Sequence, residues 1–119
     1  MTLRTIVIYK QFDIVAVPFT FVDSAITKKR PAIILSSHTF NQKNKHSIMA
    51  MITSARNSHW YGDVNITNLS SAGLPKPSII RMKFFTLDHQ LILNSLGTLS
   101  KKDQSTLRKM AQSIFDKLL

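Results

Sequence analysis

The hydrophobic residues of this chain fall into short runs that are rich in isoleucine and valine and are separated by polar segments. Runs of this length and composition are typical of β-strands. Five or six strands are predicted from the runs at residues 14–19, 31–35, 48–53, 63–66, 78–85 and 90–93, with a polar segment at 36–45 after the second. Short, closely spaced strands favour a small barrel, because closing a sheet on itself removes exposed strand edges.

The period of the pattern changes at the C-terminal end. Between residues 100 and 119 the apolar side chains recur at helical spacing, at Leu107, Met110, Ala111, Ile114, Phe115 and Leu118. Ser100 followed by Asp103 resembles a capping box, with a shorter acid than the usual Glu, and Gly97 is expected to form a turn before it. The sequence therefore predicts a mostly β fold whose C-terminal helix packs its apolar stripe on the barrel.

Composition limits the remaining possibilities. A chain of 119 residues has the size of one domain, here 1–119, and an apolar content of 44% argues against disorder. There is no cysteine, so disulfide frameworks and thiolate metal sites are excluded. No apolar run has the length of a signal-peptide core or of a membrane span. We expect a soluble, cytoplasmic protein without a membrane partner.

The net charge points to a polyanionic partner. Sixteen Lys and Arg against six Asp and Glu give a formal charge of +10, and a field of that sign attracts polyanions. Nucleic acid, an anionic membrane and an acidic protein all fit this charge. The basic residues are scattered along the chain, which favours a structured binding face over a basic tail.

The common catalytic and cofactor motifs are missing from the sequence. There is no Glu, the four histidines lack metal-ligand spacing, and no nucleophile elbow, P-loop or dinucleotide fingerprint occurs. Arg, Lys, Ser and Thr at strand ends remain, and such groups suit phosphate chemistry, in which charge builds on oxygen atoms. No metal and no cofactor are expected.

Several segments resemble the MazF/PemK toxins of type II toxin–antitoxin systems, in the PemK-like branch. They are FDIVAVPF at 12–19, KKRPAIILS at 28–36, IMAMITS at 48–54, AGLPKPSIIR at 72–81, FTLD at 85–88 and LGTLS at 96–100. The segments occur in the family's order and, with the final helix, cover residues 12–118. The resemblance implies an SH3-like barrel of the CcdB/PemK type and a homodimer. It also implies metal-independent cleavage of single-stranded RNA by 2′-hydroxyl attack, and silencing by a cognate antitoxin with an acidic segment.

The resemblance also assigns candidate catalytic residues. The family's catalytic Arg falls on Arg30, its catalytic Thr on Thr53, and a supporting late Arg on Arg81. Because Arg30 precedes Pro31, its backbone is biased toward extended geometry, and a guanidinium there can hold two phosphate oxygens at once. A guanidinium keeps its proton in proteins, which suits a transition-state clamp better than a general base. The alternative is that Arg30 is a solvated strand-end charge and Thr53 an ordinary strand residue.

The general base stays open. Some relatives carry a Glu before the Arg-Pro pair, where this chain has only Asp23, and PemK-type members carry an Asp at the position of Lys83. Asp23 and His59 are therefore the candidates for acid–base work.

The remaining basic and aromatic candidates form a predicted RNA-binding set: Lys28, Lys29, Arg56, Trp60 and Lys83. The segment 55–63 interleaves basic and aromatic residues, an arrangement that suits stacking on unpaired bases. The alternative is that Trp60 closes the core or a dimer interface.

Two other functions compete with the ribonuclease. One is a gyrase poison of the CcdB type, which shares the fold but relies on a Trp-containing C-terminus, whereas this chain ends in DKLL. The other is a catalytically decayed member that only binds RNA or antitoxin. The presence of Arg30 and Thr53 favours the ribonuclease.

Overall fold

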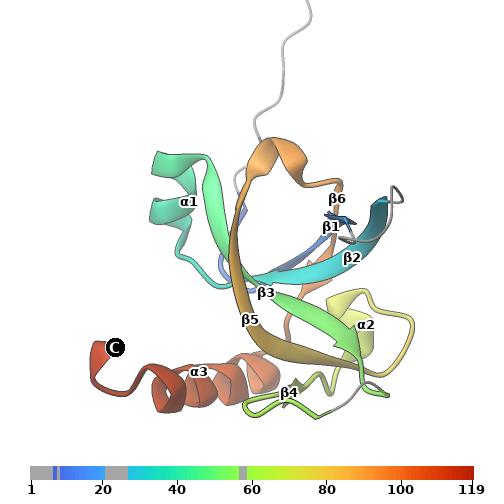
Figure 1. Ribbon diagram of the computed structural model, residues 1–119, viewed down its shortest axis with the longest axis vertical. Coiled ribbons are helices and arrows are strands. Elements are labelled where there is room, and N and C mark those ends of the chain that lie inside the picture. Colours follow the sequence, from blue (N-terminus) through green and yellow to red (C-terminus); the bar gives the residue numbers. More distant parts are fainter. Residues whose placement is uncertain (1–6, 8, 21–26, 57–58) are drawn as a thin grey trace, which may run out of the picture.

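The fold is a curled antiparallel sheet with a helix packed on it. The computed structural model describes residues 7, 9–20, 27–56 and 59–119 (Figure 1). Within these residues the strands are β1 (Asp13–Thr20), β2 (Thr27–Ile34), β3 (His46–Ser54), β4 (Val64–Asn65), β5 (Ser78–Asp88) and β6 (Asn94–Thr98), and the α-helices are α1 (His38–Asn44), α2 (Leu69–Ala72) and α3 (Lys101–Phe115). The 3₁₀ turns are η1 (His89–Leu91) and η2 (Asp116–Leu118).

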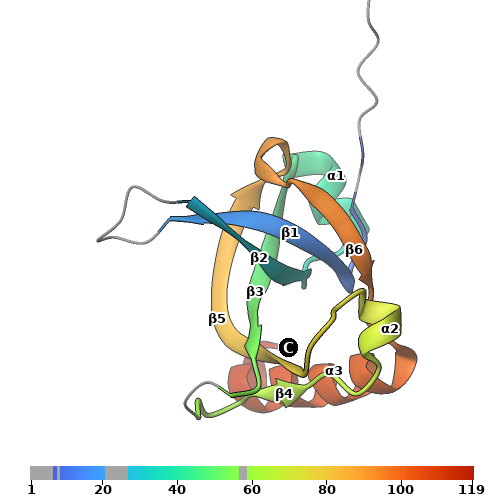
Figure 2. The same cartoon turned by 90° about the vertical axis from the view of Figure 1, so that its right-hand side faces the viewer.

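The strands form one sheet in the order β4-β5-β3-β2-β1-β6. Figures 1 and 2 show the sheet curling into a half-barrel, with α3 lying along one end of it. The predicted small β barrel with a C-terminal helix is confirmed.

Each face of the sheet has its own apolar cluster, because successive side chains of a strand point to opposite faces. One cluster includes Ile33, Ala50 and Ile52 and receives the apolar stripe of α3, with Leu107 only 2% exposed. The second cluster includes Val15, Val17 and Ala32 on the other face. The functional side chains described below project from this second face.

The N-terminus of α3 departs from the predicted capping box. The Ser100 hydroxyl accepts a hydrogen bond from the Asp103 backbone N–H, as expected for an N-cap. The Asp103 carboxylate instead accepts hydrogen bonds from the Thr67 hydroxyl and from the backbone N–H groups of Thr67 and Asn68. Asp103 therefore links α3 to the segment that leads into α2.

Two sequence-based predictions about the region before α3 are wrong. Residues 90–93 lie mainly in and after η1, and the final strand is β6; only Ile92 of this run is buried, while Leu91 and Leu93 are each 50% exposed. Gly97 lies within β6, not in a turn. Its Cα packs against the backbone of Ser71 and Ala72, where a Cβ would collide with the Ser71 carbonyl oxygen.

The connecting segments contain helices that the hydrophobic pattern did not predict. Within 36–45, α1 is capped by the Ser37 hydroxyl and ends at Lys45 in a left-handed conformation. A second short helix, α2, ends at Gly73, also left-handed. Among the described residues no helix is both long and apolar enough to cross a bilayer.

Candidate functional site

The pairing of β1, β2, β3 and β5 arranges residues in rows across the sheet. One row, called the Arg81 row, consists of the paired residues Val15, Ala32, Met51 and Arg81. The adjacent row, called the Arg30–Thr53 row, contains the pairs Val17 with Arg30 and Thr53 with Ile79. Since alternate residues of a strand share a face, both rows project from the face of the second apolar cluster.

Arg30 and Thr53 lie at the same end of the β2–β3 ladder. The last pair of that ladder is Ala32 with Met51, and Arg30 and Thr53 each lie two residues beyond it on their strands. Arg30 is exposed and Thr53 is half-buried. The fold thus places a cationic side chain and a hydroxyl, which the sequence leaves 23 positions apart, on neighbouring strands beyond the same end of this ladder.

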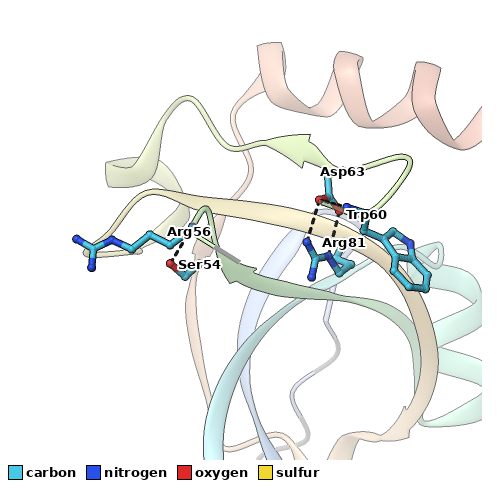
Figure 3. Close-up of polar contacts among 5 residues, drawn as sticks. All are labelled: Ser54, Arg56, Trp60, Asp63 and Arg81. Atoms are coloured by element: carbon cyan, nitrogen blue, oxygen red, sulfur yellow. Dashed lines mark hydrogen bonds and ion pairs between the residues drawn. The ribbon is translucent and has the colours of Figure 1, made fainter. Parts of the chain in front are cut away.

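Arg81 lies one row away and is held by a carboxylate. Its Nε donates to Asp63 Oδ1 at 3.2 Å and its Nη2 donates to Asp63 Oδ2 at 3.0 Å (Figure 3). Both side chains are largely covered, with 11% and 13% of their surfaces exposed. Burial opposes ionisation of Asp63, but the hydrogen bonds from Arg81 and from the Trp60 backbone N–H, with the charges of Arg81 and His59, hold its pKa below the ordinary value. Asp63 is therefore an ionised partner of Arg81 at neutral pH.

The Asp63–Arg81 pair also anchors the segment 59–63. Asp63 Oδ2 accepts a hydrogen bond from the Trp60 backbone N–H at 3.2 Å, and the Lys83 ammonium lies 4.7 Å from the centroid of the Trp60 ring. Trp60 is 42% exposed and the adjacent Tyr61 is 79% exposed. The alternative that Trp60 closes the core is therefore wrong, while a place in a dimer interface stays a prediction.

The other predicted site residues are more widely spread. Lys28 and Lys29 are exposed neighbours on β2, and His59 is exposed close to Asp63. Arg56 is exposed just after β3, and its side chain extends away from the Asp63–Arg81 pair (Figure 3). Asp23, one of the two candidate general bases, lies outside the described residues.

Sequence reasoning missed Asp63. At the position where the resemblance predicts an acid close to the late Arg, this chain has Lys83, and the carboxylate of Asp63, the residue before β4, lies beside Arg81 instead. The register of β4 with β5, Val64 opposite Ile80, sets Asp63 beside Arg81. The signal available in the sequence was a lone acid before the alternating Val64 and Ile66, which is too weak to assign a partner.

Metal-ligating residues do not gather at this site. Over the part of the chain that the structure describes, no three His, Cys, Asp or Glu side chains form a group that could hold a metal ion. The donors and cations on this face are instead guanidinium, ammonium and hydroxyl groups, which match the oxygen atoms of a phosphodiester.

Known proteins were compared with this chain. No match was found among curated proteins. An endoribonuclease in complex with its cognate antitoxin, from mycobacterial species, superposes with a TM-score of 0.71 at 10% identity, over 92% of this chain and 96% of that one. The MazE–MazF structure from Deinococcus radiodurans gives 0.70 at 17% identity, over 92% and 97%. A MazF toxin of Mycobacterium tuberculosis gives 0.69 at 20% identity, over 87% and 96%.

These structural similarities establish the fold. The family assignment comes from the sequence, since the profile of the PemK-like, MazF-like toxins of type II toxin–antitoxin systems matches residues 10–115. That match spans both rows, the segment 59–63 and all of α3. This chain belongs to the PemK-like, MazF-like family of toxins.

Proposed function

We propose that this protein is a sequence-specific endoribonuclease that cleaves single-stranded RNA without a metal ion. The observation that carries the proposal is the placement of Arg30 and Thr53 at the same end of the β2–β3 ladder, in a chain of a family with solved endoribonuclease relatives. In the proposed reaction the ribose 2′-hydroxyl attacks the adjacent phosphorus and loses its proton. The bond to the 5′-oxygen breaks, and that oxygen leaves as a hydroxyl, so the products are a 2′,3′-cyclic phosphate and a 5′-hydroxyl end.

Arg30 and Thr53 each have a proposed role that fits the chemistry of the side chain. The Arg30 guanidinium binds the two non-bridging phosphate oxygens and stabilises the charge that builds on them in the transition state. The Thr53 hydroxyl donates a hydrogen bond to the same phosphate. Lys28 and Lys29, which precede Arg30 on β2, add positive charge along the path of the RNA backbone. His59 and Asp23 are the candidates for proton transfer.

Two protein partners belong to the proposal. Solved relatives are complexes with a cognate antitoxin, and the +10 charge of this chain suits an acidic antitoxin segment that competes with RNA. A second copy of the chain completes a homodimer.

The first experiment incubates purified protein with a long single-stranded RNA in EDTA and maps the cut sites and their end groups. Discrete cuts that leave 5′-hydroxyl ends are expected. Arg30→Ala should lower the cleavage rate by about 100- to 1000-fold, the loss typical of one preorganised donor, with folding preserved because Arg30 is exposed. Lys109→Ala, which removes an exposed charge from α3, is the matched control and should cut normally.

Intact RNA with folded wild-type protein would reject the ribonuclease and leave a gyrase poison or a decayed binding protein. Normal cutting by Arg30→Ala would reject the site while keeping the activity. A gyrase-supercoiling assay separates the two non-nuclease outcomes.

A further inference from the structure

We infer that Asp63 and Arg81 are positioning residues that hold Trp60 as a stacking platform for an unpaired RNA base on the same RNA strand as the cleaved phosphate. This inference rests on the proposed function and deepens it. It assigns Asp63 a role and replaces the supporting catalytic role that the resemblance implies for Arg81 by support of the segment 59–63.

The first argument is the geometry of the ion pair. Two nitrogens of Arg81 bind the two oxygens of Asp63, an arrangement that fixes the orientation of both groups. The same carboxylate accepts the Trp60 backbone N–H. The carboxylate therefore ties the backbone of the segment 59–63 to β5 (Figure 3). A carboxylate bound in this way, with its pKa lowered, is a poor proton acceptor, which argues against a role as general base.

The second argument is the state of Trp60. Large aromatic side chains are usually buried, yet this indole is 42% exposed although its backbone is tethered. The Lys83 ammonium lies 4.7 Å from the ring centroid. Because this cation lies over one face of the indole, a base would stack on the other face, and the ammonium supplies a charge for the phosphate that follows the base.

The third argument is position. Arg81 pairs with Met51, and Thr53 lies two residues further along β3 on the same face. Diagonal neighbours of this kind are separated by about 7–8 Å between Cα atoms. Arg81 is therefore adjacent to the Arg30–Thr53 row, and the Trp60 ring lies at Lys83, two residues beyond Arg81 along β5. A base a short distance along the strand from the cleaved bond reaches the platform.

Trp60 is the only tryptophan of the chain, so its fluorescence reports on the platform alone. The probe is a 2′-O-methyl RNA oligonucleotide copied from a cut site, which lacks the attacking hydroxyl. If the wild type cuts nothing, a random-sequence pool of the same length replaces it. Binding should quench the Trp60 emission of the wild type, and Trp60→Ala should weaken binding by about 5- to 100-fold, the range for one stacked base. Trp60→Phe should restore most of the affinity.

A double-mutant cycle tests the positioning role. Asp63→Asn and Arg81→Lys should each raise the KM for a short RNA and leave kcat within about twofold, because Arg30 and Thr53 are untouched. In the Trp60→Ala background, Asp63→Asn should cause no further loss, since its effect acts through Trp60. Thermal melting confirms that each variant is folded, and Arg81→Lys, which keeps the charge, replaces Asp63→Asn if the latter unfolds.

The outcomes separate this inference from the proposed function. Cleavage that is insensitive to Trp60→Ala, or additive losses in the cycle, would overturn the inference and leave the ribonuclease intact. A fall in kcat for Arg81→Lys with unchanged KM would give Arg81 the supporting catalytic role that the resemblance implies and would also overturn the inference. Quenching by the oligonucleotide pool without cleavage would reject the ribonuclease and keep the base platform.

Discussion

Replacing Asp103 by Ala tests how much the hydrogen bonds between α3 and the segment before α2 stabilise the fold. The carboxylate is 1% exposed and accepts hydrogen bonds from the Thr67 hydroxyl at 2.7 Å, the Thr67 N–H at 2.9 Å and the Asn68 N–H at 3.2 Å. Among the described residues, no other side chain of α3 forms a hydrogen bond with the segment before α2. The substitution should therefore destabilise the whole fold, since α3 covers the first apolar cluster.

The magnitude follows from the three lost bonds. A hydrogen bond to a charged group is worth about 1.5–3 kcal/mol, and the losses are not additive. Thr67 and Asn68 are exposed, so in the variant water can accept some of the hydrogen bonds that these residues donate to the carboxylate. We therefore expect the free energy of unfolding to fall by about 2–4 kcal/mol in total, and Tm to fall by roughly 10 °C for a domain of this size.

Urea unfolding at pH 7 and at pH 3 provides the assay, with Asp103→Asn as a second variant. Burial opposes ionisation of Asp103, but the bonds from Thr67, Asn68 and Ser100 hold its pKa below the ordinary value. Its stabilisation is therefore present above about pH 4, the unfolded value, and is lost as the pH falls through the folded pKa. The difference in the free energy of unfolding between wild type and Asp103→Asn should be smaller at pH 3 than at pH 7. Asp116→Asn, an exposed acid at the end of the same helix, should cost less than about 0.5 kcal/mol. An equal difference in the free energy of unfolding between wild type and Asp103→Asn at both pH values would refute the reasoning.

Three further predictions concern other parts of the molecule. Burial lowers the pKa of His89, and the charges of His46 and Lys45 lower it further against the opposing charge of Asp88. The unfolded chain therefore takes up a proton at higher pH than the folded chain does, so the free energy of unfolding should fall as the pH drops below about 6.5. The difference between the urea midpoints at pH 7 and pH 5.5 should be smaller in His89→Gln than in the wild type. Leu107→Ala should lower the free energy of unfolding by about 2–5 kcal/mol in urea, because Leu107 is 2% exposed; a cost under about 1 kcal/mol would show that α3 packs loosely. Binding of 2′-O-methyl RNA should weaken steeply with salt, each phosphate contact adding about −0.7 to the log–log slope; a flat response in a filter-binding titration would contradict a charged RNA path.

Most of the strands could be predicted because their positions depend on local composition. The isoleucine- and valine-rich runs match β1, β2, β3 and β5, and the change to helical spacing matches α3. The run at 90–93 misled because exposed Leu91 and Leu93 have the same composition as core residues. Helix α1 was missed because its one buried residue is polar: Asn41, whose amide donates to the Tyr9 carbonyl.

The candidate site was only partly predictable, for a physical reason. Arg30, Thr53 and Arg81 came from the resemblance to the toxin family, since no spacing in the sequence relates them. The partner of Arg81 could not be found in this way, because Asp63 reaches it only through the pairing of the two-residue strand β4 with β5. Long-range register is the information that a single sequence does not display.

The distribution of the site over the sheet has a consequence for the order of folding. Arg30, Thr53 and Arg81 belong to β2, β3 and β5, and the pairing of β3 with β5 must close the intervening segment 55–77. Closing such a loop costs entropy before its contacts form, so this pairing is expected to be slow compared with the local β1–β2 hairpin. A chain emerging from the ribosome therefore lacks the assembled site until residue 81 and the strand around it have been synthesised and paired. With the proposed ribonuclease activity, this delay would keep the nascent chain harmless to the message that encodes it.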